Sequence, residues 1–148
     1  MPNRKFYITT PIYYVNDRPH IGTAYTTMAA DVVARFKRLQ GYEVMYVTGT
    51  DDNSEKNAQS AKRQGISTKE YVDKMSAGFA QTWDRLGLSC DRFIRTTEER
   101  HHKAVYEFWR RVEKNNDIYR GTYQGLYCVG CEAYLSEGDL VDGKCPLH

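Results

Sequence analysis

Three cysteines and one histidine near the C-terminal end of the sequence have the spacing of metal ligands. Two residues separate Cys128 from Cys131 and Cys145 from His148, and thirteen residues lie between the two pairs. Each pair forms a short chelating turn, and together they offer three thiolates and one imidazole, the donor set of a closed tetrahedral zinc site. The spacing therefore predicts structural Zn²⁺, and the alternative is a set of reduced cysteines in a small β region.

A second group of residues, near the N-terminal end, has the types that hold phosphate. His20 and Gly22 follow Pro19, where an amphipathic helix is expected to begin. A helix N-terminus presents unpaired N–H groups and partial positive charge, so it attracts phosphate. His20 adds a ring donor, and Gly22 leaves room for a ligand against the backbone. For an isolated His-x-Gly, the alternative is a Pro-capped helix start with a solvent-facing histidine.

The elements that must position this histidine follow from the hydrophobic pattern. Residues 6–10 are rich in aromatic and β-branched side chains and predict a strand, and residues 43–48 predict a second one. Between them, residues 21–40 carry apolar side chains at helical intervals. This βαβ unit predicts an α/β fold with a mostly parallel sheet and a right-handed crossover. Ligands of such sheets bind beyond the carboxyl ends of strands, so the loops expected at residues 11–19 and 49–53 should share a site.

Two more helices are expected after the second strand. Residues 54–64 predict a short helix, and Ser67 with Glu70 forms a capping-box pattern that opens a longer helix ending at Gly87. The face that the longer helix is expected to bury consists of Tyr71, Met75, Phe79 and Trp83. The face expected to be buried on the first helix consists of Ala24, Met28, Val32 or Val33, Phe36 and Leu39.

The alternation of strands and helices continues beyond this point. Residues 92–95 predict a short strand. Thr96 with Glu99 predicts a second capping box, at the start of a helix that runs to about Asn115.

Length and composition are those of a globular protein with one domain's worth of chain. The sequence has 148 residues, 41% of them hydrophobic, and its net charge of +2 neither predicts nor excludes a nucleic-acid partner. It has no run of about eighteen apolar residues and no apolar N-terminal segment, so a cytoplasmic location without a membrane span is expected. The sequence becomes rich in Tyr and Gly toward its C-terminal end, which predicts a domain boundary between residues 1–117 and residues 118–148.

Several of these segments resemble class I aminoacyl-tRNA synthetases, and specifically the methionyl-tRNA synthetase family. The first signature of that class, His-Ile-Gly-His, is matched by residues 20–23, after a Thr-Pro-Ile-Tyr-Tyr-Val-Asn loop at residues 10–16. The final histidine of the signature is Thr23 in this sequence. The resemblance covers essentially the whole chain and continues through residues 41–44, 48–52, 93–98 and 127–132.

The resemblance implies a fold, a reaction and its partners. Residues 1–117 would form the first half of a Rossmann-like nucleotide-binding fold, and residues 118–148 the start of a zinc-binding connective insertion. The family activates methionine with ATP and Mg²⁺ to methionyl-adenylate and then transfers methionine to tRNA. Activation needs in-line alignment on the α-phosphate and donors aimed at the phosphate oxygens.

Residue by residue, the resemblance assigns the substrate site. His20 and Thr23 are the predicted catalytic residues, and together with Gly22 they are the predicted ATP-binding residues. The predicted methionine-binding residues are Pro11, Ile12, Tyr14 and Asp52. Because threonine is shorter than histidine and cannot carry charge, impaired but not abolished activation is expected, with local backbone bonds of Thr23 as the alternative. The alternative for Asp52 is a helix-capping acid.

Two other patterns have structural interpretations. Lys74-Met75-Ser76 matches part of the second synthetase signature, Lys-Met-Ser-Lys-Ser, but it lies in a predicted amphipathic helix, so Met75 is expected in the core. His101 and His102 are adjacent on a predicted helix and point about 100° apart, so they are expected on its surface rather than at a metal.

The family pattern also indicates what this sequence is expected to lack. The second half of the nucleotide fold, its Lys-Met-Ser-Lys-Ser loop and the anticodon-binding helices find no match. A half-sheet would leave an exposed edge and an unburied face, so association with a partner or with itself is expected. We expect the isolated chain not to be catalytically competent. The alternatives are another class I synthetase and a zinc-knuckle RNA-binding module without catalysis.

Overall fold

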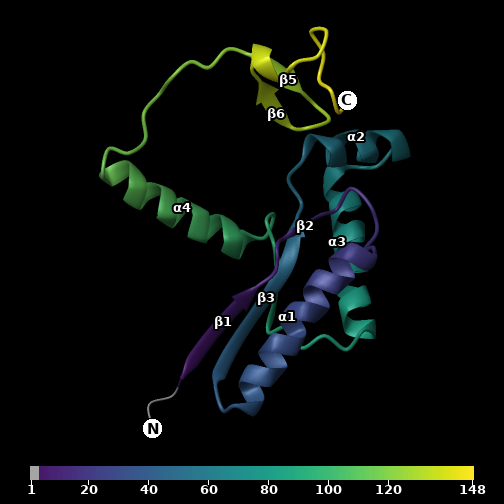
Figure 1. Cartoon of the computed structure of the whole chain (residues 1–148), viewed down its shortest axis with the longest axis vertical. Helices are drawn as coiled ribbons and strands as arrows, with labels where there is room; N and C mark the ends of the chain where they lie inside the picture. The colour runs from purple at the N-terminus through teal and green to yellow at the C-terminus, as the bar shows by residue number, and fades with distance from the viewer. Residues whose placement is uncertain (1–3) are drawn as a thin grey trace. The chain divides into compact units, whose positions relative to one another are not determined.

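The computed structural model describes residues 4–148, which divide into two compact units. Unit 1 comprises residues 1–105 and unit 2 comprises residues 106–148 (Figure 1). Each unit is described by itself. The division into residues 1–117 and 118–148 remains a prediction.

Unit 1 is built on a parallel sheet with β3 (Glu43–Asp51) at its centre. Thr9 of β1 (Lys5–Thr9) and Arg92 of β4 (Arg92–Arg95) both pair with Val47, so β1 and β4 lie on opposite edges of β3. The short β2 (Tyr13–Tyr14) pairs with Thr50 and Asp51, on the edge that β1 occupies further back. All three pairings are parallel, which confirms the expected α/β class with a mostly parallel sheet.

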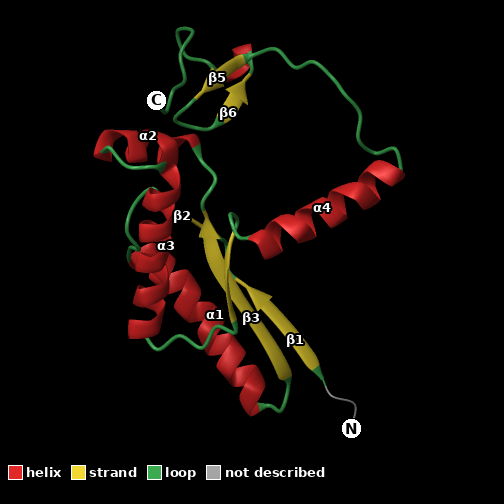
Figure 2. Ribbon diagram, turned by 180° about the vertical axis from the view of Figure 1, so that it is seen from behind, coloured by secondary structure: helices red, strands yellow, loops and turns green. Residues whose placement is uncertain are grey.

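Helices α1 (Ile21–Leu39), α2 (Glu55–Gln64) and α3 (Thr68–Arg85) follow β2 and β3. Figures 1 and 2 show α1 and α3 along the same side of the sheet. Side-chain caps start all three helices, because His20, Ser54 and Ser67 each accept a hydrogen bond from a backbone N–H of the first turn. The helices expected around residues 54–64 and after Ser67 are therefore confirmed.

The core of unit 1 has two clusters. The larger one contains Tyr13, Val15, Ala61, Tyr71, Val72, Phe79 and Trp83, and Met75 packs against it. Three of the four residues expected to be buried on α3 are therefore core residues, and the fourth is partly buried. The smaller cluster joins Ala30 and Ala34 of α1 to Tyr46 of β3.

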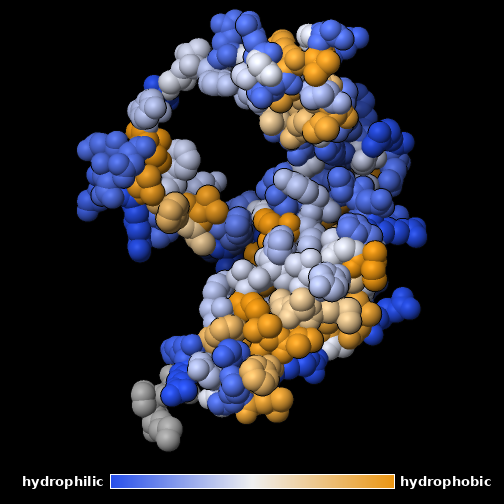
Figure 3. All heavy atoms as spheres, viewed as in Figure 1, coloured by the Kyte–Doolittle hydropathy of each residue, from blue (hydrophilic) through white to orange (hydrophobic). Residues whose placement is uncertain are grey.

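The expected buried face of α1 is wrong except at Ala24, which is partly buried against the larger cluster. Met28, Val32 and Leu39 are 47%, 67% and 87% exposed, and Val33 and Phe36 are exposed as well. The helix instead buries its small and polar residues, Thr27, Ala30, Asp31 and Ala34. Small side chains bring the helix backbone close to β3, where the Tyr46 hydroxyl donates to the Thr27 carbonyl oxygen at 2.8 Å. Figure 3 shows hydrophobic residues exposed over this part of unit 1.

Three local predictions near the carboxyl ends of the strands are also wrong. Residues 49–51 belong to β3 rather than to a loop, and the expected loop at residues 11–19 contains β2. Thr96 does not cap a helix, because α4 (Glu99–Lys114) begins three residues later and the Thr96 hydroxyl instead donates to Asp51 and accepts from the Asp52 N–H. Thr96 bonds to Asp51 and Asp52 because the sheet ends here and the polar groups at its end need hydrogen-bond partners.

Unit 2 contains the later part of α4 and a small hairpin. Strands β5 (Leu126–Cys128) and β6 (Ala133–Leu135) are antiparallel, and the short 3₁₀ helix η1 (Glu137–Asp139) follows. No residue from 106 to 148 is buried. The hairpin therefore lacks an apolar core that could hold it together.

Candidate functional site

His20 is the N-cap residue of α1, and its ring is fixed by the helix that it caps. Its Nδ1 atom accepts a hydrogen bond from the Gly22 N–H at 3.1 Å. Because Nδ1 is an acceptor, the neutral ring carries its proton on Nε2. The Nε2–H is therefore the donor that this exposed ring can offer to a ligand beside the positive end of the helix.

Thr23 holds His20 from the opposite side of the cap. Its hydroxyl donates to the His20 carbonyl oxygen at 2.8 Å and accepts from the His20 N–H at 3.1 Å. These are the local backbone bonds that the sequence left as the alternative for Thr23. A direct role of Thr23 toward ATP stays a prediction.

Gly22 is required by the ring of His20. A Cβ atom at Gly22 would lie 3.0 Å from Cε1 and 3.1 Å from Nδ1 of that ring, closer than ordinary van der Waals contact. The space beside Gly22 is thus partly filled by His20 itself. Any larger side chain here would shift the one ring donor of the site.

One cavity collects most of the predicted site residues from the first loop. It has a volume of about 230 Å³, and Ile12, Tyr14, His20 and Thr23 line it, with Tyr13 and Phe79 of the core. Apolar and aromatic side chains therefore lie beside the His20 ring, whose N–H could donate to a phosphate. Pro11 and Gly22 are not among the residues that line this cavity.

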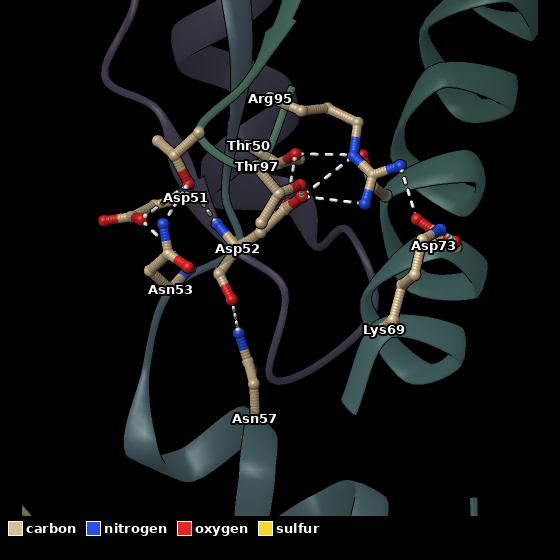
Figure 4. A network of polar contacts seen from close by, with 11 residues as sticks. Thr50, Asp51, Asp52, Asn53, Asn57, Lys69, Asp73, Arg95 and Thr97 are labelled. Carbon is tan, nitrogen blue, oxygen red and sulfur yellow. Dashed lines mark hydrogen bonds and ion pairs between the residues drawn. The ribbon is translucent and has the colours of Figure 1, made fainter. Parts of the chain in front are cut away.

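Asp52 lies elsewhere, at the centre of a buried polar network (Figure 4). Its Oδ1 atom accepts from the Thr50 hydroxyl at 2.8 Å, and its Oδ2 atom accepts from Arg95 Nε at 2.8 Å and from the Thr97 hydroxyl at 2.6 Å. Arg95 Nη2 lies 2.7 Å from Oδ2 as an ion-pair contact without hydrogen-bond alignment. The Asp52 side chain is 0% exposed.

Arg95 extends this network to α3. Its Nη1 atom lies 2.8 Å from Asp73 Oδ1, and Lys69 pairs with the same carboxylate. Burial lowers the pKa of the Arg95 guanidinium, but hydrogen bonds to Asp73 and Asp52 outweigh burial and the pKa is raised overall. The hydrogen bonds from Lys69 and Arg95 lower the pKa of Asp73. Arg95 and Asp73 are therefore held in their charged forms.

The capping alternative for Asp52 is wrong, because Ser54 caps α2 and Asp52 makes no such bond. Asp52 instead lines a second cavity of about 400 Å³ together with Arg95 and Thr97. Of the predicted methionine-binding residues, Ile12 and Tyr14 thus line one cavity, Asp52 lines the other, and Pro11 lines neither. Sequence reasoning missed Arg95 and Thr97. Arg95 is the last residue of β4, which pairs with β3, and Thr97 lies two residues beyond it, where polar side chains of a parallel sheet converge.

The remaining patterns occupy helix surfaces and core positions. Lys74 and Met75 lie inside α3, and Met75 packs against the core as expected. His101 and His102 lie on α4 with ring centroids 6.4 Å apart. No helix in residues 4–148 combines the length and apolar character needed to cross a membrane.

The four predicted metal ligands of unit 2 do come together. Their ligand atoms all lie within 4.8 Å of one another. Cys131 Sγ is 3.6 Å from Cys145 Sγ, and His148 Nδ1 is 3.8, 3.3 and 3.9 Å from the Sγ atoms of Cys128, Cys131 and Cys145. Tetrahedral zinc with Zn–S of about 2.3 Å and Zn–N of about 2.0 Å requires separations of about 3.8 Å between sulfurs and about 3.5 Å between sulfur and nitrogen. The cluster therefore fits a tetrahedral metal ion.

Contacts among the four ligands shift the pKa values of two of the thiols in opposite directions. Hydrogen bonding with Cys145 raises the pKa of Cys131 to about 11, whereas the hydrogen bond with His148 lowers the pKa of Cys145 to about 6. The Cys131 N–H donates to Cys128 Sγ at 3.4 Å. Thiolates this close repel one another, so a bound cation is the group that would stabilise them together.

Gly130 permits the approach of His148. A Cβ atom at Gly130 would lie 2.3 Å from His148 Cγ, a distance that real contacts do not reach. We therefore expect Gly130→Ala to displace the imidazole and to weaken metal binding about tenfold or more. Competition with a chromophoric chelator measures the affinity, and Gly138→Ala, whose Cβ would meet nothing closer than 3.9 Å, is the matched control. Equal affinities of the two variants would show that Gly130 does not position the ring.

Comparison with known proteins identifies the family to which this chain belongs. Residues 6–148 match the family described as "tRNA synthetases class I (M)". The methionine–tRNA ligase of Thermosynechococcus vestitus is 52% identical over 97% of this chain, and that of Clostridium perfringens is 49% identical over 99%. The chain spans 27% and 23% of these two relatives, about a quarter of their length.

Solved structures agree with the family. The Mycobacterium tuberculosis methionyl-tRNA synthetase in complex with methionyl-adenylate is 44% identical with a TM-score of 0.88, over 95% of this chain and 28% of that one. The Agrobacterium radiobacter LeuRS in a ternary complex with tRNA and LeuAMS has a TM-score of 0.79 at 20% identity, over 98% of this chain and 19% of that one, and shows the fold alone. Because the family model matches residues 6–148 of the 148 in this chain, the chain belongs to the class I tRNA synthetases of the methionine type.

Proposed function

We propose that this chain supplies the phosphate-binding side of the activation site of a methionine–tRNA ligase. In this reaction the methionine carboxylate attacks the α-phosphorus of ATP, pyrophosphate leaves, and methionine is then transferred to tRNA. The likeness to a synthetase solved with methionyl-adenylate supports the proposal, and the observation that carries it is the capped ring of His20. This ring places a donor where a helix already attracts phosphate.

His20 acts in this proposal as an electrostatic donor rather than as an acid or base. Negative charge spreads over the phosphate oxygens in the transition state, and the Nε2–H with the N-terminal amides of α1 would stabilise it there. Gly22 and Thr23 position the ring, through the close approach and the two hydrogen bonds described above. Because the donor is fixed before the substrate binds, little reorganisation is needed during the reaction.

The methionine side of the site combines the two cavities. Pro11, Ile12 and Tyr14 offer exposed apolar and aromatic surface for a flexible thioether. Within the described residues, Asp52 Oδ1 accepts a hydrogen bond from Thr50 alone, so it retains capacity to accept from the α-ammonium group. Since the Asp52 side chain is fully buried, this contact requires the Arg95–Asp52 network to open.

The metal and the other substrates complete the proposal. Cys128, Cys131, Cys145 and His148 would hold Zn²⁺ as a structural ion with four protein ligands and no open coordination position. ATP with Mg²⁺ is the second substrate and tRNA the acceptor. The chain spans about a quarter of its relatives, so we expect no activation by these 148 residues alone.

The test is a chimera in which this chain replaces the matching segment of the Mycobacterium tuberculosis enzyme. Amino-acid-dependent exchange of pyrophosphate into ATP measures the activation step. We expect exchange with methionine and background rates with leucine. Exchange driven by leucine, or none with any amino acid from a folded chimera, would contradict the proposal.

A further inference from the structure

A third cavity in unit 1 gathers positive charge from three separate elements. It has a volume of about 470 Å³ and is lined by Arg18 from the segment before α1, Arg63 from α2 and Lys74 from α3, among others. None of the residues assigned to ATP, methionine or zinc lines it. The cavity is thus a separate concave site with three cationic side chains.

None of these three cations forms an ion pair with a carboxylate of the described residues. Arg35, Arg38, Lys69, Arg95, Lys103 and Arg111 all form ion pairs with carboxylates. Within residues 4–148, no ion pair involves Arg18, Arg63 or Lys74, and the side-chain bond of Arg63 goes to the Ser60 hydroxyl at 2.8 Å. Three like charges around one cavity without ion-pair partners favour an anionic ligand.

One carboxylate, Asp17, also lines the cavity. Its Oδ1 atom accepts from the Arg18 N–H at 2.7 Å and so is occupied within its own turn. The lining residues therefore carry three positive charges against one negative charge. The excess remains positive.

The wall of the cavity is held in place by the core. Tyr71 is 3% exposed, and its hydroxyl donates to the Asn16 carbonyl oxygen at 3.3 Å. This bond ties the Asn16–Arg18 segment to α3, which also carries Lys74. Ser60, the hydrogen-bond partner of Arg63, is 8% exposed on α2. The Arg63 side chain is thus held by a buried hydroxyl, and the backbone beside Arg18 is held by Tyr71, which lowers the entropic cost of binding.

We propose that this cavity binds a small phosphate anion of the polyphosphate class, with pyrophosphate as the simplest member. Arginine binds phosphate oxygens with paired N–H groups, and lysine adds a point charge. Three cations suit a ligand with several negative charges better than a single carboxylate. The proposal does not depend on the proposed function, because the cavity uses other residues.

The cavity has a defined relation to the His20 site. Asn16, Asp17 and Arg18 line both the 470 Å³ cavity and the 230 Å³ cavity that contains His20. The two cavities therefore adjoin across this three-residue segment. A polyphosphate bound beside Arg18 would lie next to the site from which the proposed reaction releases pyrophosphate.

The experiment is a titration of the 148-residue chain with pyrophosphate, followed by the NMR shifts of backbone amides. We expect saturable shifts at residues 16–18, 60–64 and 71–75. Arg63→Gln and Lys74→Gln should each weaken binding about fivefold. Both side chains are exposed, so the fold should be retained. Lys62→Gln, which removes the same charge from an exposed neighbour outside the cavity, should leave the affinity unchanged.

Three results would overturn the proposal. The first is the lack of saturable shifts in unit 1. The second is shifts confined to the Cys128–His148 region, which would mean that pyrophosphate only sequesters the metal. The third is equal weakening by Lys62→Gln and Arg63→Gln, which would show a general charge effect. An RNA oligonucleotide that needs Arg63 and Lys74 and that pyrophosphate does not displace would identify the cavity as an RNA contact instead.

Discussion

Replacing Arg95 with leucine is expected to destabilise unit 1 by about 3–5 kcal/mol, because it leaves a buried carboxylate without its partner. Arg95 contacts Asp52 through Nε and Nη2 and Asp73 through Nη1. The Asp52 side chain is 0% exposed, so its desolvated charge depends on the guanidinium. The Thr50 and Thr97 hydroxyls remain as donors but carry no charge.

Urea unfolding followed by the fluorescence of Trp83 measures this loss. Trp83 is buried in unit 1, and a Trp109→Phe background removes the exposed second tryptophan. Arg92→Leu is the matched control, since Arg92 is exposed on the same strand. The double variant Asp52→Leu/Arg95→Leu should lose less than the sum of its single variants. A loss of under about 1 kcal/mol for Arg95→Leu would show that the network does not stabilise the sheet.

Cys131→Ser, or removal of the metal by a chelator, is expected to unfold the hairpin of unit 2 while unit 1 stays folded. No residue from 106 to 148 is buried, so β5 and β6 have no apolar core to fall back on. In such small units the free energy of metal binding is the free energy of folding, about 10–16 kcal/mol in zinc-finger peptides. The four ligands at residues 128–148 are therefore expected to determine whether the hairpin forms.

The measurement combines metal content with NMR of the hairpin amides. Wild type should bind one Zn²⁺ and show dispersed signals for Leu126–Leu135, and both should be lost in Cys131→Ser. Cys90→Ser is the control, because Cys90 packs against the Tyr46 cluster of unit 1 and should leave both unchanged. A chelated chain that retains its hairpin signals would contradict this account.

The fold was predictable wherever local signals and packing agree. The capping serines and the apolar stripe of α3 located two helices, and Tyr71, Phe79 and Trp83 are indeed core residues. The prediction of the buried face of α1 is wrong because hydrophobic periodicity selects the face with large apolar side chains. The face that is buried in α1 has small side chains, which allow the helix to approach the sheet closely. Ala30 and Ala34 pack against Tyr46, and the larger residues of α1 remain exposed.

The metal ligands could be predicted from the sequence, but the hydrogen bonds that hold Asp52 and His20 could not. Cysteine spacing located the metal cluster because all four ligands are close in sequence or joined by one hairpin. The pairing of Asp52 with Arg95 joins residues 43 positions apart, and only the strand register of the sheet brings them together. Likewise, a sequence motif gives the position of His20 but not the hydrogen bond that fixes its tautomer.

The most direct test of the central claim is the turnover of a His20→Ala variant in the chimera with the Mycobacterium tuberculosis enzyme. If the His20 ring stabilises charge on the phosphate in the transition state, kcat for methionine-dependent pyrophosphate exchange should fall about 10²–10³-fold, with a smaller change in KM for methionine. His102→Ala, a change of the same kind on α4, should leave kcat unaltered. A His20→Ala chimera that is folded and exchanges pyrophosphate at the unmodified rate would contradict the account.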